Sequence, residues 1–504
     1  MEVYLGWALV WVWVWLALLA TRSWWKSTAN HGLRLPPGPW TLPIIGSLHH
    51  LAGKLPHCAL RDLARRHGPV MLLRLGEVPT LVISSPAAAR EVLKTQDPAF
   101  ASRSLTVTMR VVTCDGRDII FSPYGEYWRQ LRKVAVTELL TMRRVRSFRA
   151  IREEEVATML HHVERAAAAG TPMDMRTRLS AIVSDTTFRA VMGDRCKQRD
   201  VFLRELDSLV SLTSGLNPVD LWPSSWIARL LSGDLRRAKK NHAVVFQIIR
   251  DIVQEHLKGG GDEAEDLVDV LLKVHKDGGV DMLGVEAVIF DLFSAGSETS
   301  ATTLEWAMAE MIKNPTVMKR ATAEVRRAFE AGGKVVEDRL GADLPYLQLV
   351  VRETLRLHPP LPLLLPRQCR QPCKVLGFDV PEGTQVIVNG WALGRDEQSW
   401  PDATEEFRPE RFEAGDGADF RGTDFEFLPF GAGRRMCPGM AFGLANVELP
   451  LASLLLHFDW EAPGISDPAE FDMTEGFGVT ARRKATLLLR PSLRVPTPRT
   501  GLVA

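Results

Sequence analysis

Helical periodicity dominates the pattern of apolar and polar residues along the chain. A broken helical pattern fills residues 143–275, with breaks at glycine and proline. The clearest uninterrupted helical runs lie at residues 56–67, 125–140, 281–313, 346–358 and 440–456. Short apolar runs typical of strands lie at residues 70–75, 80–84, 375–378 and 385–388. The pattern therefore predicts a mainly α protein with a smaller β-rich region, an α+β fold.

The N-terminal segment follows a different pattern. Residues 3–20 carry no charge, and a membrane-spanning helix needs about 20 apolar residues. Trp24 and Trp25 follow at the position of an interfacial belt, and Arg22 and Lys26 place positive charge on the C-terminal side. Only Glu2 precedes the apolar run, whereas a cleaved signal peptide begins with basic residues. We interpret the segment as a retained anchor whose following body faces the cytosol.

Length and proline content suggest how the rest of the chain is divided. A chain of 504 residues would by length alone contain two to four domains. Consecutive prolines after the anchor stiffen the backbone and predict a linker. The predicted division is an anchor at 1–22, a basic and proline-rich linker at 23–40, a catalytic domain at 41–495 and a tail at 496–504.

Charge and cysteine content exclude several classes of protein. Lysine and arginine number 62 against 61 acidic residues, so nothing in the net charge of +1 points to nucleic acid. The six cysteines are scattered, which is typical of a reducing compartment rather than a disulfide framework. Cys369 and Cys373 form a C-x-x-x-C with no second pair nearby, so a zinc site is not expected.

Residues 430–439 place a cysteine in a loop rich in glycine and arginine, directly before a helical pattern. Gly431, Gly433 and Gly439 lack a Cβ, so the backbone can turn tightly and approach a flat ligand closely. Backbone N–H groups in such a turn, and the following helix N-terminus, would favour a thiolate at Cys437. The alternative is a buried cysteine that acts as a small hydrophobe. The residues around it favour a ligand role.

A polar pair interrupts the long apolar helix predicted at 281–313. Residues 295–300 read AGSETS, so Glu298 and Thr299 lie side by side in an apolar run. Such local conflicts often mark function. Alternatively, Thr299 bonds back to a backbone carbonyl and bends the helix, and a bend of this kind is compatible with a functional pocket.

Other pairs lie at helical spacing. Trp128 and Arg132 are four residues apart and share a helix face; an exposed arginine over an aromatic ring is the alternative reading. Glu353 and Arg356 are three apart among apolar neighbours, and Arg411 follows within the sequence PERF. A surface ion pair would contribute little to stability. The apolar surroundings favour a buried network instead.

Together these motifs resemble the signature set of the cytochrome P450 superfamily. Residues 430–439 fill every fixed position of F-x-x-G-x-R-x-C-x-G, and residues 295–300 match [AG]-G-x-[DE]-T-[TS]. W-x-x-x-R, E-x-x-R and P-E-R-F occur in the expected order, and the resemblance runs from the anchor to Arg490. The chain is most similar to plant A-type microsomal members of specialised metabolism. This implies one mostly helical P450 body behind an N-terminal transmembrane helix, in place of several domains.

The resemblance implies haem b with Cys437 as the axial thiolate ligand of the iron. It also implies further residues that pack against the haem or meet its propionates: Phe430, Trp128, Arg132, Arg367 and Arg435. A buried triad would brace the haem-binding loop: Glu353, Arg356 and Arg411.

On the oxygen side, the resemblance implies that Thr299 holds oxygen and a water molecule while Glu298 helps relay protons. Glutamate is the less common acid at this position. The substrate pocket implied by the resemblance is apolar: Ala295, Ala301, Leu361, Leu363, Leu364, Phe477 and Val479. A small hydrophobic substrate is therefore expected.

The implied activity is an NADPH- and O₂-dependent monooxygenase that hydroxylates a terpenoid, either a sesquiterpene or a diterpene. Oxidation of an indole, phenolic or oxime substrate by the same chemistry is the alternative. A membrane-bound haem protein for electron transfer or sensing, and an inactive membrane-tethered scaffold, are alternatives from other classes. No flavin or nicotinamide motif occurs, so electrons would come from NADPH–cytochrome P450 reductase, with Arg129, Lys133 and Arg434 as a docking patch. The implied location is the endoplasmic reticulum membrane, spanned once.

Overall fold

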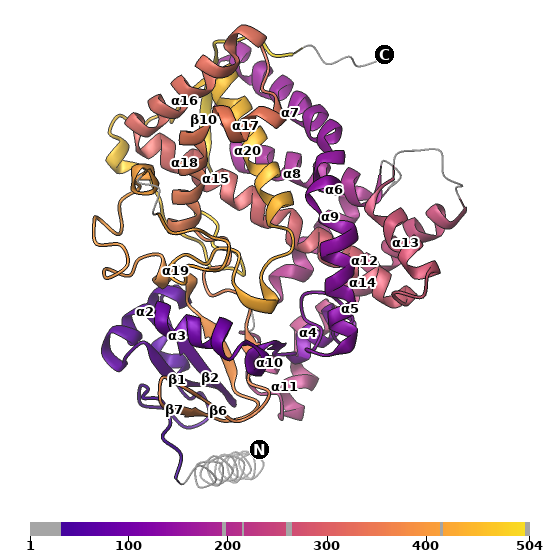
Figure 1. The fold of residues 1–504 in the computed structure, drawn as a ribbon, viewed down its shortest axis with the longest axis vertical. Helices are drawn as coiled ribbons and strands as arrows, with labels where there is room; N and C mark the ends of the chain where they lie inside the picture. Colours follow the sequence, from indigo (N-terminus) through magenta and orange to yellow (C-terminus); the bar gives the residue numbers. More distant parts are fainter. Residues whose placement is uncertain (1–31, 194–197, 214–215, 259–264, 414–416, 499–504) are drawn as a thin grey trace, which may run out of the picture.

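A computed structural model describes residues 32–193, 198–213, 216–258, 265–413 and 417–498. The predicted anchor at 1–22, most of the predicted linker and the end of the tail lie outside these residues. A larger helical part stands over a smaller β-rich part, as Figure 1 shows. The mainly α fold with a smaller β-rich region is thus confirmed.

The helical part is built from long helices with buried apolar faces. The helices of eight or more residues among the described residues are α2 Pro56–His67, α5 Glu126–Val134, α7 Arg149–Ala169, α8 Met175–Met192, α9 Arg199–Ser211, α12 Gly233–Lys258, α13 Leu267–Lys276, α14 Met282–Gly296, α15 Glu298–Lys313, α16 Pro315–Phe329, α18 Pro345–Leu357 and α20 Met440–His457. Trp306 of α15 is fully buried at the centre of the largest apolar cluster, which joins α7, α8, α15, α18 and α20.

Helix α20 is apolar on nearly all sides because it lies inside this cluster. Within the described residues it is long and apolar enough to cross a membrane, but most of it is buried in the protein. A helix that is apolar all round and packed on every side is a core helix. Its N-terminus, which follows the cysteine loop directly, is held in place by this packing.

The β-rich part consists of small sheets. Five strands form the largest sheet in the order β1-β2-β8-β5-β3, with bounds Val70–Leu75, Val78–Ile83, Gln385–Val388, Arg367–Gln368 and Ser102–Arg103. The strand-like runs at 70–75 and 80–84 correspond to β1 and β2, which form an antiparallel hairpin with Leu72 opposite Leu81. β4 Met173–Asp174, β9 Phe458–Glu461 and β10 Leu488–Leu493 form a second sheet, and β6 Cys373–Val375 pairs with β7 Phe378–Val380.

Two sequence-based expectations differ from the structure. The strand predicted at 375–378 is the turn between β6 and β7, where Leu376 and Gly377 have positive φ angles of 45° and 84°. The helix predicted at 281–313 is divided into α14 and α15 at Ser297. In both places local hydrogen bonding and turn geometry override the apolar pattern.

The segment between residues 97 and 124, which lacks clear periodicity, contains short elements of its own. The turn Asp97–Phe100, strand β3 and helix α4 Val107–Val112 lie within it. The segment then passes under α14, where two backbone N–H groups bond to Asp291. These contacts make the loop a wall of the cavity described next.

Candidate functional site

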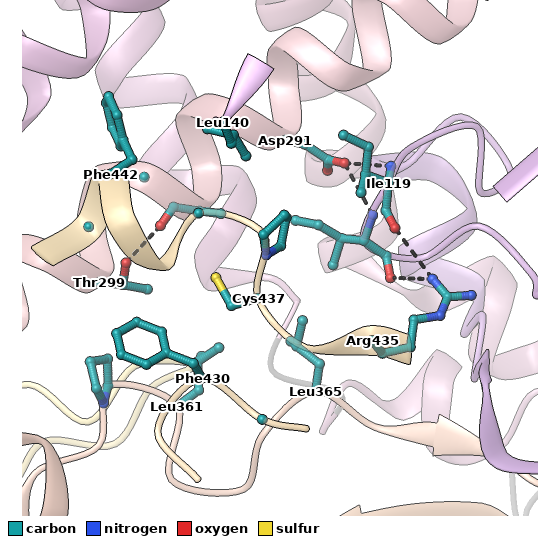
Figure 2. Close-up of a pocket in the computed structure, with 18 of the residues that line it drawn as sticks. Ile119, Leu140, Asp291, Thr299, Leu361, Leu365, Phe430, Arg435, Cys437 and Phe442 are labelled. Atoms are coloured by element: carbon teal, nitrogen blue, oxygen red, sulfur yellow. Dashed lines mark hydrogen bonds between the residues drawn. The ribbon is translucent and has the colours of Figure 1, made fainter. Parts of the chain in front are cut away.

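The cysteine loop joins the short turn Gly433–Arg435 to the start of α20. Gly433 has a φ of +68°, and a Cβ there would lie 2.1 Å from the carbonyl oxygen of Leu93. The Cys437 amide donates to the Phe430 carbonyl over 2.9 Å, which closes the loop on itself. Only glycine at 433 permits this close approach to the neighbouring backbone. The sulfur of Cys437 points into a cavity (Figure 2).

Three influences act on the pKa of the Cys437 sulfur. Burial raises this pKa, while the Gly439 N–H and the charge of Arg132 lower it. The net direction of the pKa is upward, and the expectation that loop N–H groups and the helix terminus favour a thiolate stays a prediction. Desolvation of an ionised group outweighs one hydrogen bond and one nearby cation here.

The cavity beside Cys437 is lined mainly by apolar side chains. α14 contributes Ala295, the segment after α18 contributes Leu361 and Leu364, and the cysteine loop contributes Phe430. Figure 2 shows Leu361, Leu365, Phe430 and Phe442 around the sulfur. An apolar cavity with a few convergent polar groups is the usual form of a small-molecule or cofactor site.

Four arginines gather at one edge of this cavity: Arg103, Arg132, Arg367 and Arg435. Arg103, Arg367 and Arg435 are at least nine-tenths buried. Burial, together with the charge of Arg367, lowers the pKa of Arg435 to about 9. Burial also lowers the pKa of Arg103 well below its usual range, and the charge of Arg367 adds to this effect. So much buried positive charge calls for anionic groups at this edge.

The four arginines differ in how far the protein satisfies them. Arg435 donates to the carbonyls of Ala101 over 2.7 Å and of Ile119 over 3.3 Å. Arg367 donates to Asp97 over 2.8 Å. Arg132 has no hydrogen-bond or ion-pair partner among the described residues, and it lines the cavity. An unpartnered guanidinium beside an apolar cavity with a cysteine opposite fits haem, whose rim carries two carboxylates.

Trp128 lines the cavity, and its indole N–H has a partner within the protein. Its indole N–H donates to the carbonyl of Ile119 over 3.0 Å, and its ring stacks under Arg435 at 4.2 Å. Trp128 lines the cavity with its ring, but the indole N–H has a backbone partner. In this arrangement Trp128 supports Arg435 and the loop at Ile119.

The interruption between α14 and α15 lies opposite the cysteine. Thr299 lines the cavity, and its Oγ1 donates to the carbonyl of Ala295 over 2.7 Å (Figure 2). This is the predicted back-bond of a threonine in a helix, and it coincides with the break at Ser297. The hydroxyl of Thr299 and the sulfur of Cys437 thus face one cavity.

Glu298 turns away from the cavity. Thr480 donates to its Oε1, and Arg482 forms an ion pair with the same oxygen at 2.8 Å. Glu298 is not among the residues that line the cavity, although it adjoins Thr299. Arg482 is partly exposed, at 37%, so Glu298 lies between the cavity wall and the surface.

The predicted contact among Glu353, Arg356 and Arg411 is present. Arg356 donates to both carboxylate oxygens of Glu353, over 2.7 and 2.8 Å, and Arg411 donates to Oε1 over 2.9 Å. Neither Glu353 nor Arg356 is exposed in its side chain. The arginines also donate to the carbonyls of Gly394 and Asp402, so the network holds the segment between α19 Gly390–Leu393 and Pro409.

A row of aromatic rings joins this network to the cysteine loop. Trp400 lies under Arg356 and contacts Phe412, with ring centroids 5.8 Å apart. Phe412 contacts Phe427 at 5.6 Å, and Phe420 then bridges to Phe430 at 5.4 Å. The network therefore braces the loop through packed rings and not by direct hydrogen bonds.

Four predicted pocket residues lie outside the cavity. Ala301 packs into the main apolar cluster, because it is on the side of α15 that faces the core. Phe477 is 59% exposed, and Val479 is not among the cavity-lining residues. Both lie in the loop after Phe471, whose conformation the sequence pattern did not determine. Leu363 packs in the cluster around β1 and α2 instead.

Sequence reasoning missed several residues of the cavity: Arg103, Ile119, Ile120, Asp291 and Phe442. The first three belong to the long segment between 97 and 124, which lacks periodicity and was singled out only as a long loop. Asp291 could have been noticed in the sequence as an acidic residue within the apolar run of α14.

Comparison with known proteins agrees with this geometry. A family model described as Cytochrome P450 matches residues 36–488. The chain belongs to the cytochrome P450 family. Zealexin A1 synthase from Zea mays is 47% identical over 487 residues, covering 94% of this chain and 96% of that protein. Premnaspirodiene oxygenase from Hyoscyamus muticus is 45% identical over 493 residues, covering 96% and 97%.

A solved cytochrome P450 from zebra fish, in a structure with abiraterone, has a TM-score of 0.74 and 26% identity, and the match covers 87% of this chain and 99% of that one. As a cytochrome P450 of the monooxygenase type, the protein is an oxidoreductase. The family holds haem through a cysteine thiolate, and its monooxygenases use a redox partner. The apolar cavity, Cys437 and the arginine edge fit that cofactor.

Proposed function

We propose that this P450 hydroxylates a small terpenoid, a sesquiterpene or a diterpene. The observation that carries the proposal is a cavity whose wall beside Cys437 and Thr299 is almost wholly apolar. Such a wall selects a substrate by shape and hydrophobic burial and not by charge. The two plant relatives above bear names of terpenoid oxidases, which supports the same class.

In this proposal, Cys437 would hold the haem iron through its thiolate. Bound haem supplies the activation of oxygen, and its thiolate ligand favours cleavage of the O–O bond. Arg132, with no protein partner among the described residues, meets a propionate, and Arg103, Arg367 and Arg435 surround that edge with positive charge. Phe430, which lines the cavity near Cys437, would pack against the bound haem.

In this proposal, Thr299 holds oxygen and a water molecule in the cavity, and Glu298 helps relay protons. The Thr299 hydroxyl already donates to Ala295, which keeps its oxygen turned toward the cavity as an acceptor. Glu298 lies behind it and is bound by Thr480 and Arg482, on the route from the cavity wall to solvent. The apolar lining excludes stray water from the rest of the cavity.

Electrons come from NADPH through NADPH–cytochrome P450 reductase in this proposal. Arg129, Lys133 and Arg434 are exposed on the cysteine side of the molecule, as a docking patch for an acidic partner requires. Arg129 and Arg434 both lie about the ring of Tyr124, at 5.8 and 5.9 Å, which places them together. The apolar N-terminal run would anchor the protein once in the endoplasmic reticulum membrane, with this face in the cytosol.

The test is product analysis in microsomes that contain this protein and a plant reductase. NADPH and a panel of sesquiterpenes, diterpenes, indoles, phenolics and oximes would be supplied, with Cys437→Ala as the control. We expect an NADPH-dependent hydroxylated terpenoid that is absent from the control. Turnover of indoles, phenolics or oximes alone would overturn the terpenoid assignment and leave the monooxygenase intact. Thiolate-ligated haem with no product from any class would favour electron transfer or sensing.

A further inference from the structure

Four buried acid and imidazole side chains form a continuous ladder outside the cavity. His57 Nε2 lies 2.7 Å from Glu475 Oε2, and His358 Nδ1 lies 3.6 Å from Glu475 Oε1. His358 Nε2 in turn lies 2.7 Å from Glu310 Oε1. No side chain of the four is more than 10% exposed. Buried titratable groups in this number are rare unless each has a partner.

The ladder alternates imidazole and carboxylate, so each inner group faces an opposite type on both sides. Burial alone raises the pKa of Glu475, but the nearby imidazoles of His358 and His57 lower it well below its usual range. Only the contact with His57 is short enough to be a hydrogen bond. His358 is further held by flat stacking on Trp306, with centroids 3.8 Å apart and planes 5° apart. The ladder is thereby fixed in orientation as well as in charge.

These side chains come from four different parts of the fold. His57 is on α2, Glu310 is on α15, and His358 follows the last residue of α18. Glu475 belongs to the loop 471–483, which contains no helix or strand. The ladder therefore ties this late loop to α2, to α15 and to the residue that follows α18.

The same late loop also contacts the site. The Trp306 indole donates to the Ala481 carbonyl over 2.6 Å, and the Ala481 amide donates to the Pro360 carbonyl over 3.0 Å. Pro360 lines the cavity. On either side of Ala481, Thr480 and Arg482 bind Glu298. Fastening the loop at Glu475 thus fixes the two side chains that hold Glu298 next to Thr299.

We propose that His57, Glu475, His358 and Glu310 are positioning residues for proton delivery. They hold the loop 471–483 against α15, so that Thr480 and Arg482 keep the Glu298 carboxylate in its position next to Thr299. None of the four ladder residues lines the cavity, so substrate binding should stay nearly unchanged when the ladder is lost. Proton delivery through Glu298 and Thr299 should become less efficient instead. This inference rests on the proposed role of Glu298 and Thr299.

The experiment compares His57→Leu with His57→Gln in the full-length protein. Glutamine retains a donor that can reach Glu475, whereas leucine removes it. Hydrogen exchange of segment 471–483 is expected to quicken about tenfold in His57→Leu, because a charge-assisted hydrogen bond is lost, and to stay close to wild type in His57→Gln. Exchange of segment 430–439 should not change in either variant.

The second readout is the fraction of NADPH consumed without hydroxylated product. We expect this fraction to rise severalfold in His57→Leu with KM changed less than about twofold, and to be restored in His57→Gln. His457→Leu is the matched control, since His457 is equally buried but bonds to the Val495 carbonyl, away from the ladder. Glu475→Gln, which keeps shape and removes charge, serves as a second variant if His57→Leu does not fold, with the same expectations.

Unchanged exchange at 471–483, or equal effects of His57→Leu and His457→Leu, would overturn the proposal. Faster exchange without any rise in uncoupled NADPH consumption would also overturn it, because the ladder would then be purely structural. Hydrogen exchange needs no substrate, so a wild-type protein that makes no product would count against the proposed function alone.

Discussion

The carboxyls of Asp118 and Asp291 are buried and close enough to act on each other's pKa, and they join the loop before α5 to helix α14. Asp291 Oδ2 also accepts from the backbone N–H groups of Ile119 and Ile120, over 2.7 and 3.2 Å (Figure 2). Two carboxyls in contact and away from water cannot both ionise, so they share a proton.

This shared proton predicts a pH dependence. Burial raises the pKa of Asp118 to about 6, and burial with the charge of Asp118 raises the pKa of Asp291 well above its usual range. Folded pKa values above the unfolded ones stabilise the protein at low pH, and this stability is lost as pH rises through the folded values. The pKa of Arg435, which also acts on Asp118, is lowered only to about 9, so Arg435 keeps its charge over the range in which Asp118 titrates.

We therefore expect the unfolding midpoint of the wild type to fall as pH rises from about 4, the ordinary carboxyl pKa, through the folded pKa values, of which that of Asp118 is about 6. The fall should be smaller in Asp291→Asn. The amide of asparagine donates to Asp118 without a titrating proton and still accepts from the loop. Asp291→Leu should lower the midpoint at every pH, because two buried N–H groups lose their acceptor at a cost of about 1–3 kcal/mol each. Thermal unfolding across pH measures this; equal slopes in wild type and Asp291→Asn would refute the shared proton.

Gly433→Ala should prevent the cysteine loop from adopting its present backbone conformation. The new Cβ would lie 2.1 Å from the Leu93 carbonyl in a backbone region that alanine rarely adopts. Gly431→Ala is the matched control, since Gly431 has the same φ of +68° but has no atom within 4 Å of its added Cβ. The reduced-CO spectrum should show much less thiolate-ligated haem in Gly433→Ala than in Gly431→Ala. Similar haem content in both variants would contradict this prediction.

Removing Glu353 should cost about 3–5 kcal/mol, because two buried arginines lose their shared carboxylate. Because the rings of Trp400, Phe427 and Phe430 connect this network to the cysteine loop, its loss should also loosen the loop. We therefore expect Glu353→Ala to lose haem as well as stability. Denaturant unfolding and the reduced-CO spectrum measure the two effects. Glu405→Ala, which removes a 58% exposed ion-pair partner of Arg61 and Arg395, provides the comparison and should change both measurements little. A stable, haem-loaded Glu353→Ala protein would be the contrary result.

Thr299→Val should retain haem and substrate binding but consume most NADPH without hydroxylated product, because the hydroxyl opposite Cys437 is lost. Thr303→Val is the matched control, since Thr303 lines the same cavity and bonds back to the Thr299 carbonyl over 3.0 Å. The ratio of product to NADPH should fall about tenfold or more in the first variant and little in the second. Equal ratios of product to NADPH in the two variants would show that Thr299 is not part of the proposed proton path.

Sequence alone determined the fold class, the cysteine loop and the buried triad. Helical periodicity is a local property, so the helices at 56–67 and 346–358 could be predicted within one or two residues. Motif spacing likewise predicted the contact of Glu353 with Arg356, because three residues on a helix place both on one face. Glycine at 433 reflects a backbone requirement that the sequence displays directly.

Tertiary structure alone decided which distant side chains meet. Ala301 faces the core while Ala295 faces the cavity, because the break at Ser297 sets how α15 is rotated against α20. The contacts of Asp118 with Asp291, and of Glu475 with His57 and His358, join segments separated by more than a hundred residues. No local periodicity encodes such contacts, because burial and charge pairing select them only when the whole chain has packed.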